Sequence, residues 1–214
     1  MKKNLTELVF ILDRSGSMAH LVDDTIGGFN SMLSRQKDGE GEALVTTVLF
    51  DGVNETIHDR LPIREVPQLT RKEYYVRGCT ALLDAVGMTV EHIAGIHKYA
   101  REEDRPTRTL FVITTDGYEN ASHHFSYDNL KRLITEKQEA GWEFIFLGAN
   151  IDAAKEAARF GIRQENAVDY HADSKGTEEV YCAVDAAVSQ ARCCAPMGRG
   201  WRKKLDQDYE SRKK

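Results

Sequence analysis

Residues 8–17 read LVFILDRSGS, and this stretch decides the fold. Its first half, Leu8–Leu12, is a continuous apolar run, which is typical of a short strand buried on both faces of a parallel sheet. Asp13 ends the run, and two hydroxyl side chains, Ser15 and Ser17, follow at alternate positions. The sequence therefore predicts a buried strand whose carboxyl end carries a polar turn.

Apolar runs alternate with amphipathic stretches along the rest of the chain. Further strands are predicted at 43–50, 109–115, 143–147 and 167–171, and helices at about 18–33, 82–93, 126–140, 150–161 and 177–193. Residues 55–63 alternate between apolar and polar and contain Pro62, which suits an edge strand. Strands separated by helices form βαβ units with right-handed crossovers. We therefore expect a doubly wound α/β fold with a mostly parallel, six-stranded sheet and one antiparallel edge strand.

The length and composition fit one globular domain with a basic end. The chain has 214 residues, of which 41% are hydrophobic, and a formal net charge of −5. Residues 198–214 hold seven Lys or Arg against three Asp or Glu, so the rest of the chain is more acidic than the whole. We expect a domain over 1–197 followed by a flexible basic tail over 198–214. An acidic body gives no reason to propose nucleic acid as the partner.

Neither a membrane protein nor a disulfide-bonded protein is indicated. No apolar run approaches the roughly 18 residues of a spanning helix, and the run at 8–12 is too short for a signal peptide. The four cysteines, Cys79, Cys182, Cys193 and Cys194, show no CxxC spacing. We expect them to be reduced thiols in a cytoplasmic protein.

Three polar loops are predicted to meet at one end of the sheet. The first strand is followed by Asp13, Ser15 and Ser17, another buried strand is followed by Asp116, and Thr80 lies at a helix start. In open α/β sheets, ligands bind beyond the carboxyl ends of the strands, where the strand order reverses. Two carboxylates and three hydroxyls form an oxygen donor set of the kind that Mg²⁺ takes. We therefore predict a metal site made by these five residues, with Mg²⁺ or Mn²⁺ as the ion.

The order of these motifs resembles that of von Willebrand factor type A domains. The pattern D-x-S-x-S at 13–17, G-x-T at 78–80 and an apolar strand ending T-D-G at 115–117 is similar to their metal-ion-dependent adhesion site (MIDAS). The resemblance covers about Asn4–Ala195, and the sequence around the last two motifs looks most like that of the bacterial and phage intracellular members. It implies a Rossmann-like sheet with the strand order 3-2-1-4-5-6.

The same resemblance implies a role for each donor. Ser15, Ser17 and Thr80 would bind the ion directly through their hydroxyls. Asp13 and Asp116 would hold it mainly through water, so that the ion seeks a further anionic ligand. The function implied is a divalent-metal-dependent protein-binding module that coordinates an Asp or Glu of a partner protein, and not an enzyme.

A Mg²⁺-dependent hydrolase or phosphatase with Asp13 at the metal is the alternative. Haloacid-dehalogenase phosphatases place an Asp after the first strand of a similar sheet, but they need a second Asp two residues later as acid and base. Here that position is Ser15, and Arg14 is a poor candidate for holding a phosphoryl group. The nucleotide-binding motifs G-x-G-x-x-G and G-x-x-x-x-G-K-[ST] are absent after the strands.

Other polar residues near these loops have two interpretations each. Asp51 is either a turn residue or a neighbour of the metal ligands. Asp84 is either an ordinary helix residue or one that orients the preceding loop, and Glu119 adds either to an acidic rim or to the plain surface. His123 and His124 are expected in a solvated loop rather than at the metal.

Overall fold

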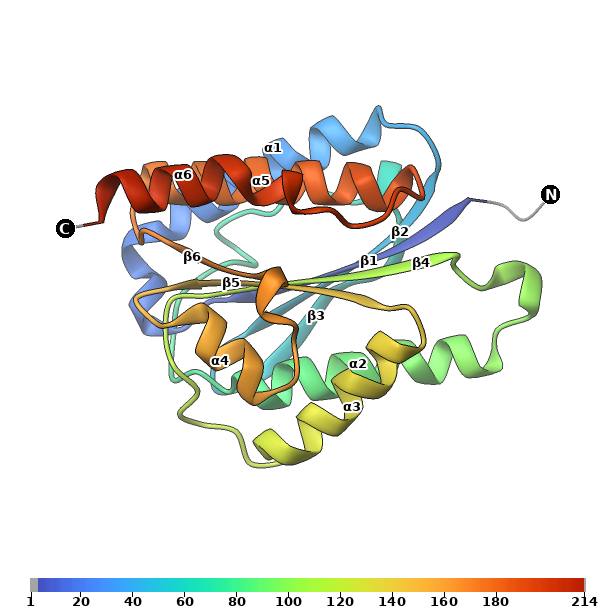
Figure 1. Cartoon of the computed structure of the whole chain (residues 1–214), viewed down its shortest axis with the longest axis horizontal. Coiled ribbons are helices and arrows are strands. Elements are labelled where there is room, and N and C mark those ends of the chain that lie inside the picture. The colour runs from blue at the N-terminus through green and yellow to red at the C-terminus, as the bar shows by residue number, and fades with distance from the viewer. Residues whose placement is uncertain (1–3, 214) are drawn as a thin grey trace.

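One six-stranded sheet forms the centre of the protein. The structure is a computed structural model of the chain and describes residues 4–213 (Figure 1). Its strands are β1 Leu5–Asp13, β2 Glu42–Phe50, β3 Asn54–Pro62, β4 Arg108–Thr115, β5 Glu143–Ala149 and β6 Ala167–Tyr170. They lie in the order β3-β2-β1-β4-β5-β6, and all neighbours are parallel except β2 and β3 at one edge. The predicted strand order and the antiparallel edge strand are confirmed.

Helices cover both faces of this sheet (Figure 1). One face carries α1 Val22–Lys37, α5 Ser174–Arg192 and α6 Lys203–Arg212, and the other carries α2 Leu82–Tyr99, α3 Tyr127–Glu139 and α4 Ala153–Arg159. Alternate residues of β1 enter two separate cores, because Phe10 packs with residues of α1 and α5 whereas Ile11 packs with residues of α2 and α3. A strand buried on both faces needs apolar side chains at every position, which explains the continuous run at 8–12.

Polar side chains cap the first turns of α3, α4 and α5. Ser126 caps α3 by accepting a 3.3 Å hydrogen bond from the backbone N–H of Asn129, and Asp152 caps α4 by accepting one of 2.9 Å from that of Lys155. The sequence predicts Asn150 as the cap of α4, but Asn150 instead adopts a left-handed φ of 56° in the turn after β5. Within residues 4–213, no helix has both the length and the apolar character needed to cross a bilayer.

The C-terminal segment differs from the flexible tail that the sequence predicts for 198–214. Arg199–Arg202 form a short 3-10 turn that continues into α6, and α6 lies against α5 and β6. Trp201 and Leu205 are buried, at 3% and 1% exposed, and they are four residues apart, so both face the core. The excess of Lys and Arg conceals these two apolar anchors, which is why composition led to the wrong prediction.

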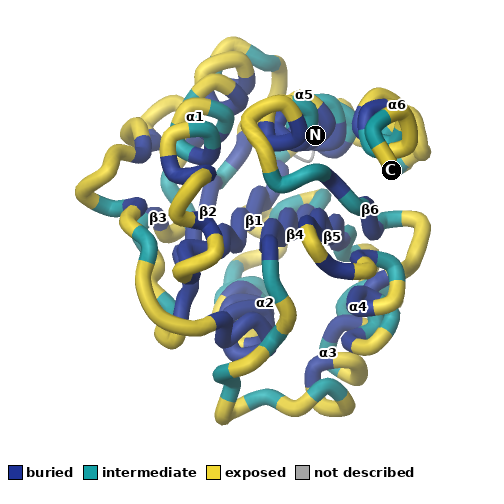
Figure 2. Tube along the Cα trace, turned by 90° about the vertical axis from the view of Figure 1, so that its left-hand side faces the viewer, coloured by how far each residue is buried: buried dark blue, intermediate teal, exposed yellow. Residues whose placement is uncertain are grey.

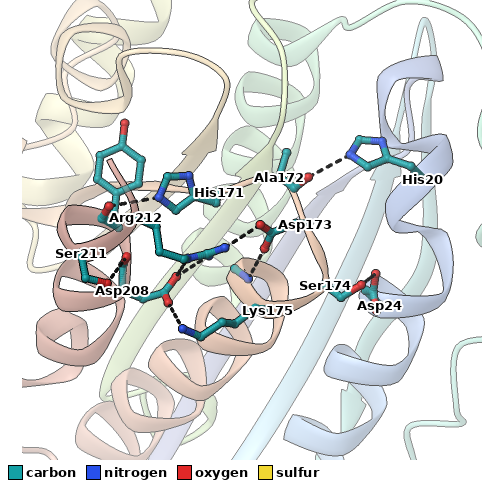
Figure 3. Close-up of polar contacts among 12 residues, drawn as sticks. His20, Asp24, His171, Ala172, Asp173, Ser174, Lys175, Asp208, Ser211 and Arg212 are labelled. Atoms are coloured by element: carbon teal, nitrogen blue, oxygen red, sulfur yellow. Dashed lines mark hydrogen bonds and ion pairs between the residues drawn. The ribbon is translucent and has the colours of Figure 1, made fainter. Parts of the chain in front are cut away.

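Charged residues of α6 hold this helix to the start of α5 (Figure 3). Asp208 forms an ion pair with Lys175 at 2.6 Å, and Arg212 forms one with Asp173, also at 2.6 Å. Asp173 in turn caps α5, because its carboxylate accepts a 2.8 Å hydrogen bond from the backbone N–H of Gly176. Part of the charge of the C-terminal segment therefore serves to dock α6.

The winding of the sheet reverses between β1 and β4. The chain leaves β1 toward α1 on one face and leaves β4 toward α3 on the other face (Figure 1). Asp13 is the last residue of β1, and Asp116 directly follows the last residue of β4. Seen from this end, buried strands lie at the centre and exposed loops surround them (Figure 2). Open α/β sheets bind their ligands at this position, so it is the place to look for a site.

Candidate metal site

Asp13 is buried at the end of β1, and the protein holds both of its carboxylate oxygens. Oδ1 accepts a 2.7 Å hydrogen bond from the backbone N–H of Ser15, and Oδ2 accepts one of 2.6 Å from the hydroxyl of Thr115. The carbonyl oxygen of Asp13 accepts a hydrogen bond from the hydroxyl of Tyr74. Sequence reasoning missed Thr115, although it stands in the T-D-G motif. Since each carboxylate oxygen has a second lone pair, Asp13 is fixed in place and still able to accept a water or an ion.

The hydroxyls of Ser15 and Ser17 connect the two acids of the site. Their Oγ atoms are 3.1 Å apart, and Ser17 Oγ donates a 2.5 Å hydrogen bond to Asp116 Oδ1. This contact brings the loop at 13–17 (the β1 loop) against the loop that follows β4 (the β4 loop, 116–125). Four of the five predicted donors are therefore linked by direct hydrogen bonds.

Thr80 brings a third loop, residues 77–80 before α2 (the α2 loop), to the same place. A Cβ built on Gly117 would lie 3.8 Å from both Ser17 Oγ and Thr80 Oγ1, so the two hydroxyls face the same space. The α2 loop is fastened to the β1 loop by a 3.4 Å hydrogen bond from the backbone N–H of Gly16 to the carbonyl of Gly78. The structure thus brings together all five predicted donors, and their role as ligands stays a prediction.

Asn120 fixes the orientation of Thr80, and sequence reasoning missed it. Its Oδ1 accepts a 2.9 Å hydrogen bond from the backbone N–H of Thr80, and its own backbone N–H donates one of 3.0 Å to the carbonyl of Thr80. Both backbone groups of Thr80 are therefore engaged, and its hydroxyl is the group left to serve a ligand. Nothing in the sequence except the closeness of Asn120 to the T-D-G motif could have indicated this.

Asp51 joins the β1 loop to the α2 loop through two arginines. Arg14 Nε and Arg77 Nε lie 2.9 Å and 2.8 Å from Asp51 Oδ2, and the carbonyl of Asp51 accepts a 2.8 Å hydrogen bond from the backbone N–H of Ala81. Burial raises the pKa of Asp51, but hydrogen bonds, above all from Arg77, outweigh burial and hold this pKa below its ordinary value. Arg14 is fully buried and also pairs with Glu55 at 2.8 Å. Of the two interpretations left open by the sequence, the structure favours a neighbour of the donors.

Asp84 orients the β4 loop, which is neither the ordinary helix position nor the hold on the preceding loop that the sequence suggests. Its carboxylate accepts hydrogen bonds of 2.8–2.9 Å from the backbone N–H groups of His123, His124 and Phe125. Glu119, a residue of the β4 loop, in turn holds the start of α2. Its carboxylate accepts hydrogen bonds from the backbone N–H of Leu83 in α2 and from those of Ala121 and Ser122 in its own loop. The two histidine side chains are exposed in this loop, as predicted.

The two acids of the site have raised pKa values. Burial and the nearby charge of Asp116 raise the pKa of Asp13 to about 6, against the hydrogen bonds that lower it, and burial raises the pKa of Asp116. Within the described part of the chain, the buried Oδ2 of Asp116 has no hydrogen-bond partner. A buried carboxylate oxygen without a partner is unfavourable, and a cation beside it would remove that penalty.

This donor set fits Mg²⁺ or Mn²⁺ better than zinc. Hard cations take carboxylate and hydroxyl oxygens, whereas zinc favours His nitrogen and Cys sulfur. Among residues 4–213, no group of three or more His, Cys, Asp or Glu side chains is placed to hold a metal ion. A metal at this end of the sheet would therefore depend on the hydroxyls of Ser15, Ser17 and Thr80 as well as on the two acids.

Solved structures of several origins share this architecture. A von Willebrand factor type A protein from Catenulispora acidiphila has a TM-score of 0.58 at 14% identity, covering 86% of this chain and 42% of that chain. Proximal thread matrix protein 1 from the mussel byssus, in a structure with a zinc-occupied MIDAS motif, has a TM-score of 0.59 at 13% identity, covering 87% and 46%. The ArnB paralog VWA2 from Sulfolobus acidocaldarius has a TM-score of 0.52 at 14% identity, covering 86% and 44%.

These likenesses concern the fold. The chain spans less than half the length of each of the three solved chains, and the sequence identities are low. No protein-family model and no curated protein sequence matches the chain.

Proposed function

We propose that this protein, which has the fold of von Willebrand factor type A domains, binds one Mg²⁺ or Mn²⁺ ion and through it an acidic side chain of a partner protein. The observation that carries the proposal is the convergence of three loops on the space beside Gly117, where Asp116 Oδ2 has no hydrogen-bond partner among the described residues. The zinc-occupied MIDAS motif of a solved neighbour supports a divalent cation at this end of the sheet.

Each donor has a role in this proposal. Ser15, Ser17 and Thr80 hold the ion through neutral hydroxyls, and the carboxylates of Asp13 and Asp116 balance its charge, in part through water. A dication held largely by neutral oxygens and water remains attractive to an anionic ligand. A carboxylate of a partner Asp or Glu supplies that ligand.

We propose binding rather than catalysis. A hydrolase that used Asp13 would need an acid–base carboxylate at position 15, where Ser15 stands. It would also need a positive charge free to hold the substrate, but Arg14 is fully buried and engaged with Asp51 and Glu55. We also propose a cytoplasmic location, supported by the four free cysteines, all exposed, which suit a reducing compartment.

Calorimetric titration of the full chain with MgCl₂ and with MnCl₂ tests the metal site. We expect the wild type to bind, and Asp13→Ala and Ser17→Ala to lose at least about tenfold in affinity, which corresponds to about 1.4 kcal/mol. Asp128→Ala serves as the control, since Asp128 is an exposed acid of α3, and it should bind as the wild type does. Unchanged affinity in both site variants would refute the proposal.

A second measurement separates binding from catalysis. Affinity capture with the full chain should retain a partner in Mg²⁺ and release it in EDTA. Generic phosphate esters incubated with the protein and Mg²⁺ should show no turnover. Turnover that Asp13→Asn abolishes would favour the hydrolase instead.

A further inference from the structure

Several exposed apolar side chains belong to segments at the carboxyl end of the sheet, where the predicted donors lie. The large hydrophobic residues that are exposed among those described are Val53, Tyr75, Met88, Tyr99 and Tyr118. Tyr99 ends α2 at the far end of the sheet, whereas Val53, Tyr75 and Tyr118 belong to loops at the carboxyl end of the sheet. Interfaces between proteins are enriched in exposed Tyr and Met, so such a group is a candidate contact surface.

The ring of Tyr75 is held by the β1 loop and the α2 loop, which both carry predicted metal donors. The guanidinium carbon of Arg14, in the β1 loop, lies 5.1 Å from the centre of the Tyr75 ring, and that of Arg77, in the α2 loop, lies 5.3 Å from it. The backbone N–H of Arg77 also donates a 3.0 Å hydrogen bond to the carbonyl of Arg14. A half-exposed ring held by two cations loses little freedom when a partner packs on it.

Val53 and Met88 extend the same surface away from the metal. The backbone N–H of Val53 donates a 3.0 Å hydrogen bond to Asp51 Oδ1, and the other oxygen of Asp51 lies 2.8 Å from Arg77 Nε. The side-chain nitrogen of the next residue, Asn54, lies 3.3 Å from the sulfur of Met88. We call Val53, Tyr75 and Met88 the apolar rim.

The charges around the apolar rim balance locally. Arg14 and Arg77 are both paired with Asp51, and Arg14 is also paired with Glu55. Two cations and two anions leave this side close to neutral, so it offers little to a second acidic group. The rim is instead suited to an uncharged apolar side chain.

We propose that the partner carries an apolar or aromatic side chain within about four residues of the acidic residue that reaches the ion, and that this side chain packs on the apolar rim. Four residues of extended chain span about 13–14 Å, which sets the reach that the proposal gives to this segment. The inference rests on the proposed function, because the acidic residue defines where the segment is anchored.

Selection from a phage-displayed random peptide library tests this inference. The full-length protein is immobilised, the library is bound in Mg²⁺, and bound phage are eluted with EDTA. The wild type should select peptides with one Asp or Glu and a nearby Leu, Ile, Phe, Tyr or Trp. Tyr75→Ala should still select the acidic residue but lose the apolar neighbour, and a peptide chosen by the wild type should bind this variant about tenfold more weakly.

Two further variants keep the test decisive. Tyr99→Ala removes an exposed tyrosine that lies far from the site, and it should select the same peptides as the wild type. Val53→Ser changes the rim without touching the arginines, and it should weaken the same peptide if Tyr75→Ala proves unstable. Mg²⁺ affinity is measured for every variant and should stay unchanged.

The outcomes separate the two proposals. Peptides that share an acidic residue without any apolar preference, or an apolar preference that survives in both rim variants, would overturn the rim and leave metal-dependent binding intact. If the wild type selects peptides rich in several acidic residues, the rim is likewise overturned. The absence of EDTA-eluted acidic peptides would overturn the proposed function together with the rim.

Discussion

Ser17 Oγ donates a hydrogen bond of 2.5 Å to Asp116 Oδ1, across 99 positions of sequence. Because Ser17 gives its only hydrogen to Asp116, Ser15 is the donor between the two serines, and Ser17 keeps one lone pair for an ion. The bond also holds the β1 loop and the β4 loop together where the sheet reverses. Because the donors contact one another in this way, a change in one of them is expected to affect its neighbours as well.

Asp116→Asn should have opposite effects with and without metal. In EDTA, the variant should be at least as stable as the wild type, because it removes one of two nearby carboxylate charges and a buried charged oxygen that has no partner among the described residues. At a Mg²⁺ concentration about 100-fold above Kd, the wild type should gain about 2.7 kcal/mol, and the variant should gain little. Thermal unfolding in EDTA and in Mg²⁺ measures both, with the exposed Asp38→Asn as control.

Mg²⁺ affinity should fall in acid. Burial and the charge of Asp116 raise the pKa of Asp13 to about 6, so protons compete with the ion below that pH. At pH 5, about one unit below this pKa, affinity should be about tenfold weaker than at pH 7.5. Calorimetric titrations at the two pH values provide the measurement, and equal affinities would show that Asp13 does not serve the ion as a charged group.

The same raised pKa makes a prediction for stability without metal. A carboxyl whose folded pKa lies above its unfolded value near 3.8 binds its proton more tightly when folded. The contribution of Asp13 to unfolding free energy should therefore rise as pH falls from about 6 toward 4. Denaturant unfolding in EDTA should show this rise in the wild type, and Asp13→Asn should lack its share of it.

Asp51→Asn should weaken Mg²⁺ binding by way of Thr80. Asp51 pairs with Arg14 and Arg77 and accepts a backbone hydrogen bond at the start of α2, so its loss should loosen the α2 loop. Breaking a buried ion pair typically costs roughly 3–5 kcal/mol of stability, so the loss is expected to show in unfolding as well.

A double-mutant cycle distinguishes this role from general destabilisation. If Asp51 acts through Thr80, the double variant with Thr80→Ala should bind Mg²⁺ no more weakly than Thr80→Ala alone. Fully additive losses would contradict that path. Asp59→Asn is the matched control, since Asp59 is an exposed acid of β3 that pairs only with His92 among the described residues, and it should leave Mg²⁺ affinity unchanged.

Trp201→Ala should destabilise the whole protein. The indole is 3% exposed and fills the core between α5 and α6, and truncation of a buried Trp typically costs roughly 3–5 kcal/mol. Lys204→Ala, at an exposed position of α6, should change stability little. Chemical denaturation of the wild type and the two variants gives the comparison. Equal stabilities would indicate that the segment is the flexible tail that its composition predicts.

The sequence was sufficient to predict the sheet and to place the five predicted donors at one end of it. The continuous run at 8–12 indicates a strand covered on both faces, and the acids at 13 and 116 follow two strands that the resemblance to von Willebrand factor type A domains places side by side. These are local patterns, so reading along the chain finds them. The apolar pair Trp201 and Leu205 is also local, but the many charges around it conceal the pattern.

Contacts between distant segments could not be predicted in this way. Arg14 is an unremarkable residue in the sequence, and its burial depends on Asp51, Glu55 and the ring of Tyr75, which come from other loops. The same holds for Asn120, whose amide oxygen is needed only because Thr80 lies against it. Such partners are set by the folded arrangement, and no spacing rule marks them.

The contact between Ser17 and Asp116 has a consequence for synthesis on the ribosome. A nascent chain contains the D-x-S-x-S motif 99 positions before Asp116, and it lacks the complete set of oxygens until Asp116 has been added and β4 has paired with β1. Pairing of strands so far apart in sequence is slow compared with local folding. Uptake of the cation would therefore report, during translation, that this long-range pairing has taken place.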